Sequence, residues 1–323
     1  MYKEMKYAPV VAFAYNRPDK IIKCLESLEN NPEALETDLI IYSDGPKSES
    51  GLEAVEDTRR AIHDYKKASS FSRFEVVEAP TNKGLAASII DGVTNVLKEY
   101  GRAIIVEDDL VVAANFLSYM NRALDFYHDN PRIGTISAYT YPLKSLKIYD
   151  KDVYVMHKGD CWGWATWDDR WNNASWADVD FDAYFKDKKL RRAFENTENG
   201  WDVNMLLLKQ GKINSWAIRW VLYLFKQNLW TVYPKESLVS NQGFDGSGTH
   251  SNKSDEAIFV RNIRDQQGEI AFEDLEPNVT MEKEASHYPV RGLYGQVMYR
   301  LKRVYVWGMN LVHSRKTISL KCE

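Results

Sequence analysis

The sequence predicts an α/β fold in which helices cover both faces of a mostly parallel sheet. In the first half of the chain, apolar runs of strand length alternate with amphipathic segments of helical period. Each apolar run ends in polar residues, and the run at 103–106 ends in three consecutive carboxylates, Glu107, Asp108 and Asp109. The carboxyl ends of parallel strands meet at one edge of a sheet, where ligands bind in open α/β folds. We therefore expect a polar cleft at that edge.

Composition limits the classes of protein that need to be considered. A chain of 323 residues is long enough for one large or two modest domains, and its net charge of −4 gives no indication of nucleic-acid binding. The three cysteines are far apart and form no CxxC pair, which fits a reducing cytosol better than a disulfide framework or a zinc site. We find no signal peptide and no apolar run of membrane-spanning length. We expect a cytoplasmic protein, soluble or peripheral on the inner face of the cell membrane.

The order of elements supports the parallel sheet. Strands are expected at residues 9–15, 39–42, 74–77 and 103–106. Helices are expected from Pro18 to about Glu29, over 52–67, and from Leu85. Pro18 suits the first turn of a helix because its missing N–H needs no partner there. The alternation of strand and helix requires crossover connections, which make neighbouring strands parallel.

The polar residues at the strand ends suit a nucleotide diphosphate. A carboxylate such as Asp44 can accept hydrogen bonds from a base or ribose, and Arg17 and Lys83 offer cations to phosphate oxygens. The three adjacent carboxylates repel one another, so a hard divalent cation held by Asp109 would relieve that repulsion and bridge two phosphates.

Each of these residues also has a purely structural explanation. Arg17 can be a surface residue at a helix cap, Asp44 a turn former and Lys83 a solvated helix start. The three carboxylates can form a solvated acidic turn. Polar clusters at four successive strand ends favour the binding site over four separate coincidences.

These motifs together resemble the GT-A glycosyltransferases. Tyr15-Asn16-Arg17, Ser43-Asp44-Gly45, Asn82-Lys83-Gly84 and the acidic triplet occur in the order found in the bacterial family 2 enzymes. The triplet, Leu110 and the downstream Asn115-Phe116-Leu117-Ser118-Tyr119 are also similar to the N-acetylglucosaminyltransferase I family. The resemblance covers about residues 8–250 and is strongest up to about 140. It implies a Rossmann-like nucleotide-binding sheet fused to an acceptor-binding half.

The resemblance also implies roles for individual residues. Asp44 would contact the base, which is uracil in many relatives, and Arg17 would contact the diphosphate. Glu107 and Asp108 would lie against the ribose and donor sugar, and Asp109 would bind Mn²⁺ or Mg²⁺. The implied reaction inverts the anomeric centre, with an acidic residue of the second half as general base.

Two residues of the second half match the family by their context. Trp164 lies in a Gly- and Trp-rich stretch similar to the segment beside the donor sugar, although an aromatic core patch is the alternative. Asp202 follows Trp201, the setting of the base in the N-acetylglucosaminyltransferase family, but it can instead be a helix N-cap. The usual Glu-Asp base signature of family 2 is absent. The other candidates for the base are Asp168, Asp169 and Asp245.

The end of the chain holds a loop and a basic segment. Residues 240–250 form a Gly-rich polar loop that we expect to close over the diphosphate. His250 in this loop is a candidate metal ligand, although a lone His more often has no such role. Residues 287–323 predict a basic amphipathic helix that either lies on an anionic membrane surface or docks on the catalytic domain.

We divide the chain into a nucleotide-sugar-binding half (1–112), an acceptor-binding half (113–250), a linker or cover (251–286) and the C-terminal helix (287–323). The predicted function is hexosyl or N-acetylhexosaminyl transfer in surface glycan synthesis. A UDP-sugar is the favoured donor, with UDP-GlcNAc as one candidate, and the acceptor is a saccharide or a lipid-linked saccharide. Two alternatives are a non-catalytic carbohydrate-binding protein and a sugar nucleotidyltransferase. The first needs no diphosphate site, and the second would show a Gly-rich loop after the first strand.

Overall fold

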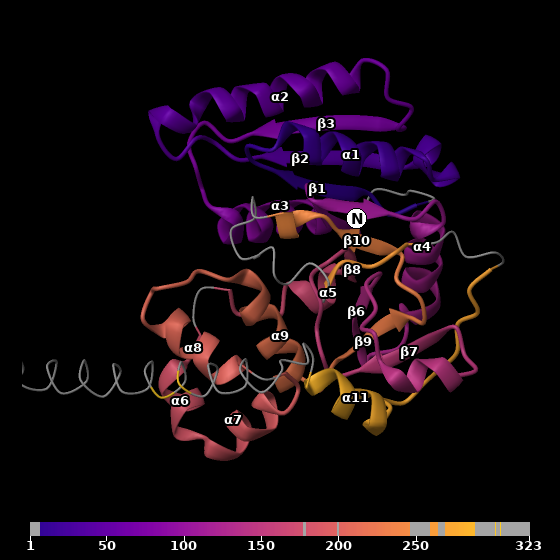
Figure 1. Cartoon of the computed structure of the whole chain (residues 1–323), viewed down its shortest axis with the longest axis vertical. Helices are drawn as coiled ribbons and strands as arrows, with labels where there is room; N and C mark the ends of the chain where they lie inside the picture. Colours follow the sequence, from indigo (N-terminus) through magenta and orange to yellow (C-terminus); the bar gives the residue numbers. More distant parts are fainter. Residues whose placement is uncertain are drawn as a thin grey trace, which may run out of the picture.

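The computed structural model describes residues 7–176, 179–198, 200–245, 259–263 and 269–287, together with Leu301 and Val304. Ten strands form two sheets within these residues (Figure 1). The main sheet contains β1 (Val10–Ala14), β2 (Asp38–Ser43), β3 (Arg73–Glu78), β4 (Arg102–Glu107), β6 (Ile133–Ser137), β7 (Val153–Met156), β8 (Trp164–Trp167) and β9 (Trp230–Pro234). The second sheet is the antiparallel pair of β5 (Leu110–Val112) and β10 (Val239–Asn241).

Helices pack on both faces of the main sheet. The α-helices of the described residues are α1 (Pro18–Glu29), α2 (Leu52–Lys66), α3 (Leu85–Tyr100), α4 (Phe116–Tyr127), α5 (Asp168–Trp171), α6 (Phe181–Lys186), α7 (Lys188–Glu195), α8 (Trp201–Lys209), α9 (Trp216–Lys226) and α11 (Val279–Ser286). Short 3₁₀ turns are η1 (Pro32–Glu36), η2 (Glu49–Gly51), η3 (Lys144–Ile148) and η4 (Gly243–Asp245). The buried faces of α1 and α4 share one core with the strands, while α3 and α9 form a second core on the opposite face.

The first half of the chain has the predicted arrangement. In the order β3-β2-β1-β4 every neighbouring pair is parallel. Alternate residues of β1 divide between the two cores, because successive side chains of a strand point to opposite faces: Val10 and Ala12 join one core, and Val11 and Phe13 the other. The predicted α/β class, with helices on both faces of the sheet, is confirmed.

The second half adds two reversed strands that the sequence analysis did not foresee. β8 is antiparallel to both of its neighbours, β4 and β6, and β7 is antiparallel to β9. Trp164 at the start of β8 pairs with Ile105 near the end of β4. The segment that precedes Trp164 therefore reaches the sheet at the edge where the acidic strand ends.

Helices α6 to α9 form a layer beside the main sheet. Their own core contains Tyr184, Phe194, Trp201 and Met205. Figure 1 shows α9 between the strands and the other helices of this layer, and α9 also contacts α3. We call these four helices the helical layer.

Some of the predicted segments lie wholly or partly outside the described residues. His250 and the rest of the predicted loop beyond Asp245 are among them, as is the helix expected at 287–323 apart from His287, Leu301 and Val304. Within the predicted linker, α11 packs on the main core through Met281 and Ala285, which are both buried. In the part of the chain that the structure describes, no helix combines the length and the apolar character needed to cross a bilayer.

Candidate functional site

The three carboxylates at the end of β4, Glu107, Asp108 and Asp109, are called the acid edge here. Arg17 occupies the N-cap position of α1, just before Pro18, and its side chain makes no cap hydrogen bond. It lies instead against the acid edge. Its Nε donates to Oδ2 of Asp108 at 3.2 Å, and Nη2 donates to Oδ2 of Asp109 at 3.0 Å and also to Oδ1 of Asp108. The strand end and the helix start thus bring together the cation and the acids that the sequence predicted for one site.

The acid edge is poorly solvated. Burial and the charges of Asp109 and Asp108 raise the pKa of Glu107 to about 8. Burial raises the pKa of Asp108 to about 6, although Arg17 acts in the opposite direction. Burial alone would lower the pKa of Arg17, but attraction to Asp108 and Asp109 outweighs it and raises that pKa. One guanidinium contacts two aspartates here, with Glu107 next to them in the chain, so additional positive charge would be stabilised.

The chemistry of the acid edge fits a hard divalent cation shared with a ligand. Among the described residues no group of three or more His, Cys, Asp or Glu side chains is arranged to hold a metal ion. Mg²⁺-type sites at phosphates usually need only one or two carboxylates, because phosphate oxygens and water complete the coordination. Asp109, half-buried at the end of the edge, suits that role. It also contacts Arg17, so a cation would compete with the guanidinium for this carboxylate.

The start of the predicted loop packs directly on the acid edge. The backbone N–H of Gln242 donates to the carbonyl of Asp109 at 2.7 Å. A Cβ atom on Gly243 would lie only 2.3 Å from Oδ2 of Asp109, so this position accommodates no larger residue without displacing the carboxylate. Lys20, one turn after Arg17 on α1, donates to the carbonyl of Gln242 at 2.7 Å and pairs with Asp245 at 2.6 Å. Lys20 was missed by the sequence analysis, although its spacing from Arg17 places both on one side of α1.

Asp44, at the end of β2, holds the loop that precedes α3. Its Oδ1 accepts hydrogen bonds from the N–H groups of Gly45 and Lys83, both at 2.8 Å. Its Oδ2 accepts from Gly84 N–H and from the Asn82 amide, both at 2.9 Å. Gly84 has φ +77°, a conformation that side chains with a Cβ rarely adopt. These four donors use the roughly four acceptor sites of a carboxylate, so contact with a base would require one of them to be exchanged.

Two further cations, Lys83 and Arg59, lie near the ends of β2 and β3. The ammonium of Lys83 lies 3.1 Å from Asp91 on α3, and its side chain is about half exposed. Its backbone, rather than its ammonium, joins the Asp44 cluster. Arg59, which the sequence analysis did not single out, donates to the carbonyls of Ala79 at 2.7 Å and Asp44 at 3.3 Å. Arg59 therefore ties the ends of the two strands together.

A comparison with protein families finds a similarity in this half of the molecule. Residues 10–152 match the family model described as glycosyl transferase family 2. These residues, a little under half of the chain, are therefore similar to the family 2 glycosyltransferases. The matched residues form the parallel half of the sheet and include the acid edge at the carboxyl end of β4, the arrangement that the resemblance to GT-A glycosyltransferases predicted. The similarity to the N-acetylglucosaminyltransferase I family stays a prediction.

Solved structures show a more general likeness. S. aureus TarS 1–349 is 11% identical, with a TM-score of 0.41 over 72% of this chain and 59% of that chain. The same protein in complex with UDP-GlcNAc is 16% identical, with a TM-score of 0.31 over 41% of this chain and 33% of that one. Glucosyl-3-phosphoglycerate synthase from Mycobacterium tuberculosis, in complex with Mn²⁺, UDP and glucosyl-3-phosphoglycerate, is 11% identical, with a TM-score of 0.33 over 51% and 58%. The matched part thus spans less than two thirds of each of these structures, and no curated protein sequence matches this chain.

Trp164 lies beyond the matched region and belongs to the core. It is 0% exposed, and its ring packs on those of Trp171 and Trp216 at centroid distances of 5.5 and 5.1 Å. A ring buried in this way has no free face for a sugar, so we do not carry Trp164 into the proposed donor site. Trp162 is only partly buried and lies 5.8 Å from Phe244, next to Gly243. Sequence pattern could not choose between the two, because both belong to one Trp-Gly-Trp stretch.

Asp202 lies in the helical layer, where it forms an ion pair. Arg191 donates to both of its carboxylate oxygens, at 3.1 and 2.8 Å, and Tyr184 O–H donates at 3.2 Å. The residue is 3% exposed and lies in the first turn of α8, next to the helical layer's own core. The structure therefore does not bring Asp202 into any contact with the acid edge among the described residues.

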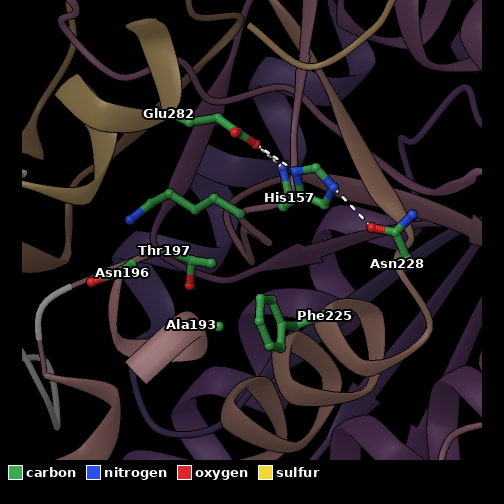
Figure 2. A pocket seen from close by; sticks show the side chains of 8 residues that line it. His157, Ala193, Asn196, Thr197, Phe225, Asn228 and Glu282 are labelled. Carbon is green, nitrogen blue, oxygen red and sulfur yellow. Dashed lines mark hydrogen bonds and ion pairs between the residues drawn. The ribbon is translucent and has the colours of Figure 1, made fainter. Parts of the chain in front are cut away.

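A cavity of about 340 Å³ lies between the helical layer and α11 (Figure 2). It is lined by His157, Lys158, Ala193, Asn196, Thr197, Phe225, Asn228 and Glu282. Figure 2 shows the imidazole of His157 between Glu282 on one side and Asn228 on the other. None of the lining residues is one of the predicted site residues, and His157 follows β7 at the sheet edge opposite the acid edge. We therefore treat this cavity as separate from the donor site.

Proposed function

We propose that this protein is a metal-dependent, inverting glycosyltransferase. It transfers a sugar from a nucleotide diphosphate, with a UDP-sugar as the favoured donor and UDP-GlcNAc as one candidate, to a hydroxyl of a saccharide or lipid-linked saccharide. The observation that supports this most is the contact of Arg17 with the acid edge. It lies at the carboxyl end of a parallel sheet, in the part of the chain that is similar to family 2, where open α/β folds bind nucleotides.

Each part of the donor has a partner of suitable chemistry in this proposal. Arg17 offers a planar fork to the diphosphate, and Lys20, in the same part of α1, offers a point charge. Glu107 and Asp108 face the ribose and donor sugar. Asp44 shapes the base pocket by holding the loop at 82–84. Asp109 would hold Mn²⁺ or Mg²⁺, which would supply positive charge near the departing diphosphate.

The proposed reaction is a single displacement at the anomeric carbon. The acceptor hydroxyl gives its proton to a carboxylate base while its oxygen forms the new bond to the anomeric carbon. The bond from that carbon to the diphosphate oxygen breaks, and the electron pair leaves with the diphosphate. Positive groups fixed near the leaving oxygens lower the barrier, because they stabilise charge that grows in the transition state.

The proposed setting is the synthesis of surface glycans at the inner face of the cell membrane. It rests on the basic amphipathic sequence at 287–323. Sedimentation of the full chain with vesicles tests it. Binding to vesicles that contain phosphatidylserine, but not to phosphatidylcholine alone, is expected. If the fraction of protein that sediments is the same with both vesicle types, a helix docked on the catalytic domain is the better explanation of this segment.

Calorimetric binding of UDP, GDP and dTDP, with and without Mn²⁺, tests the central proposal. One nucleotide should bind to the wild type in a metal-dependent manner, and Asp109→Ala should abolish that dependence. Asp57→Ala, which removes an exposed carboxylate from α2, serves as the matched control and should bind normally. If no nucleotide binds under any metal condition, the transferase proposal fails and a carbohydrate-binding protein on this fold becomes the better explanation.

A further inference from the structure

The connection between β7 and β8 carries a buried carboxylate that the mechanism above does not use. Asp160 is 9% exposed. The hydroxyl of Tyr141 donates to its Oδ2 at 2.8 Å, and the N–H of Trp162 donates to its Oδ1 at 2.8 Å. Among the described residues, each oxygen of this carboxylate thus accepts one hydrogen bond. A carboxylate oxygen has room for a second, so Asp160 can still accept a proton donor from a ligand.

A strand pairing and a shared neighbour indicate that Asp160 lies near the acid edge. The pairing of Trp164 with Ile105 brings the preceding segment to the end of β4. Cys161, the next residue, is half-buried, and loss of solvent together with the nearby charges of Asp160, Glu107, Glu198 and Asp109 raises the pKa of its thiol. Asp160 and the acid edge therefore lie around the same thiol.

The segment around Asp160 also reaches the start of the predicted loop. Trp162, whose backbone N–H donates to Asp160, has its ring centroid 5.8 Å from that of Phe244. Phe244 follows Gly243, which packs on Asp109. A ligand that extends from the acid edge toward the second half of the molecule would therefore meet the segment at 160–162.

Lys158, two residues before Asp160, joins this segment to the connection between α7 and α8. The side chain of Lys158 is 3% exposed, forms an ion pair with Glu198 and lies 4.7 Å above the ring of Tyr141. Burial raises the pKa of Asp160 to about 6, against the opposing effects of its hydrogen bonds and of Lys158. Such a group is ionised at neutral pH and is still basic enough to take a proton, which is the balance that general bases require.

We propose that Asp160, held in place by Tyr141, is the general base that removes the proton of the acceptor hydroxyl. This inference rests on the proposed function and names the acceptor side of the same site. The proton moves from the hydroxyl to a carboxylate oxygen of Asp160 while the hydroxyl oxygen bonds to the anomeric carbon and the diphosphate departs. Asp202, the base predicted from the sequence, is the rival, but both of its oxygens are held by Arg191.

Turnover of the nucleotide sugar that corresponds to the nucleotide bound in calorimetry tests this assignment. Release of the nucleotide diphosphate is followed with water and with a panel of saccharides as acceptors. Asp160→Asn should bind the nucleotide as tightly as the wild type, to within about a factor of two, and lose about 10²- to 10⁴-fold in kcat. Asp202→Asn should lose thermal stability and keep kcat within a few-fold when it is assayed below its unfolding temperature.

Tyr141→Phe supplies a readout that a merely structural role would not change. The tyrosine hydroxyl stabilises the ionised form of Asp160, so its removal should raise the pKa of the base. The acidic limb of the kcat profile, expected near pH 6, should therefore move to higher pH. The assignment would be overturned if the acidic limb of the kcat profile did not move in Tyr141→Phe, or if Asp160→Asn kept full turnover. A large kcat loss confined to Asp202→Asn would also overturn it. Absence of nucleotide binding in the wild type would instead contradict the proposed function itself.

Discussion

Arg17 and Asp108 form a two-point ion pair across the end of the sheet, with Nε of the arginine 3.2 Å from Oδ2 of the aspartate and Nη2 bonded to Oδ1. The same guanidinium reaches Asp109 at 3.0 Å. A positive group thus already lies among the acids that would face a donor and its metal. Donor binding must exchange some of these contacts, because a diphosphate competes for Arg17 and a divalent cation competes for Asp109.

Replacement of Arg17 should weaken binding of the diphosphate. Charge-assisted hydrogen bonds contribute about 1.5–3 kcal/mol, so Arg17→Ala should lower the affinity for the nucleoside diphosphate by about 10- to 100-fold. Arg17→Lys should recover only part of this loss, because an ammonium cannot form the fork. Calorimetry measures both, with Arg60→Ala as a control because that arginine is exposed on α2. Wild-type affinity in Arg17→Ala would exclude the diphosphate contact.

Gly243→Ala should disturb the acid edge through sterics alone. The added Cβ would lie 2.3 Å from Oδ2 of Asp109, so the carboxylate must move. We expect Mn²⁺-dependent nucleotide binding to weaken by about tenfold or more, while binding without metal changes little. Gly51→Ala is the matched control, because its Cβ would meet only Tyr15, at 3.9 Å. Equal metal titrations for both variants would show that Asp109 does not hold the metal.

Loss of the Asp44 carboxylate should destabilise the fold near the base pocket. Asp44→Ala leaves the N–H groups of Lys83 and Gly84 without their acceptor, which should lower the free energy of unfolding by about 2–4 kcal/mol. Asp57→Ala, at an exposed pair on α2, should change it by less than about 0.5 kcal/mol. Denaturant unfolding measures both. A loss of uridine binding with unchanged stability would instead favour direct contact between Asp44 and the base.

The parallel half of the fold could be predicted because its signals are local. Strand runs such as 103–106 are buried on both faces, and Pro18 marks a helix start. The site at the acid edge followed from strand order, since parallel strands end on one side. By contrast, the pairing of Asp202 with Arg191 and the burial of Trp164 depend on how the helical layer packs, which no local pattern reports. Asp160 escaped notice for the same reason, because the antiparallel direction of β8 brings it to the site.

The attachment of α11 should depend on pH through His157 and Glu282. Nδ1 of His157 lies 2.6 Å from Oε1 of Glu282 (Figure 2). The backbone N–H of His157 donates to the same oxygen at 2.9 Å. The hydrogen bond to Glu282 raises the pKa of His157 above its ordinary 6.5, although burial opposes this. Burial would raise the pKa of Glu282, but the hydrogen bonds from His157 lower it below 4.5.

These two shifts define a pH window in which α11 is held most firmly. The contribution of His157 to the stability of this contact is complete below pH 6.5 and is lost as pH rises through the raised pKa of the histidine. The contribution of Glu282 is complete above pH 4.5 and is lost as pH falls through the lowered pKa of the glutamate. Amide hydrogen exchange of α11, corrected for intrinsic rates, should therefore show the greatest protection between these values and less at pH of about 8–9. His157→Gln should remove the decline above neutral pH at a cost of about 1 kcal/mol in local stability. Linkage requires the difference in α11 protection between the wild type and His157→Gln to follow the protonation of His157. If that difference stayed constant from about pH 5 to 9, His157 would not be the titrating group.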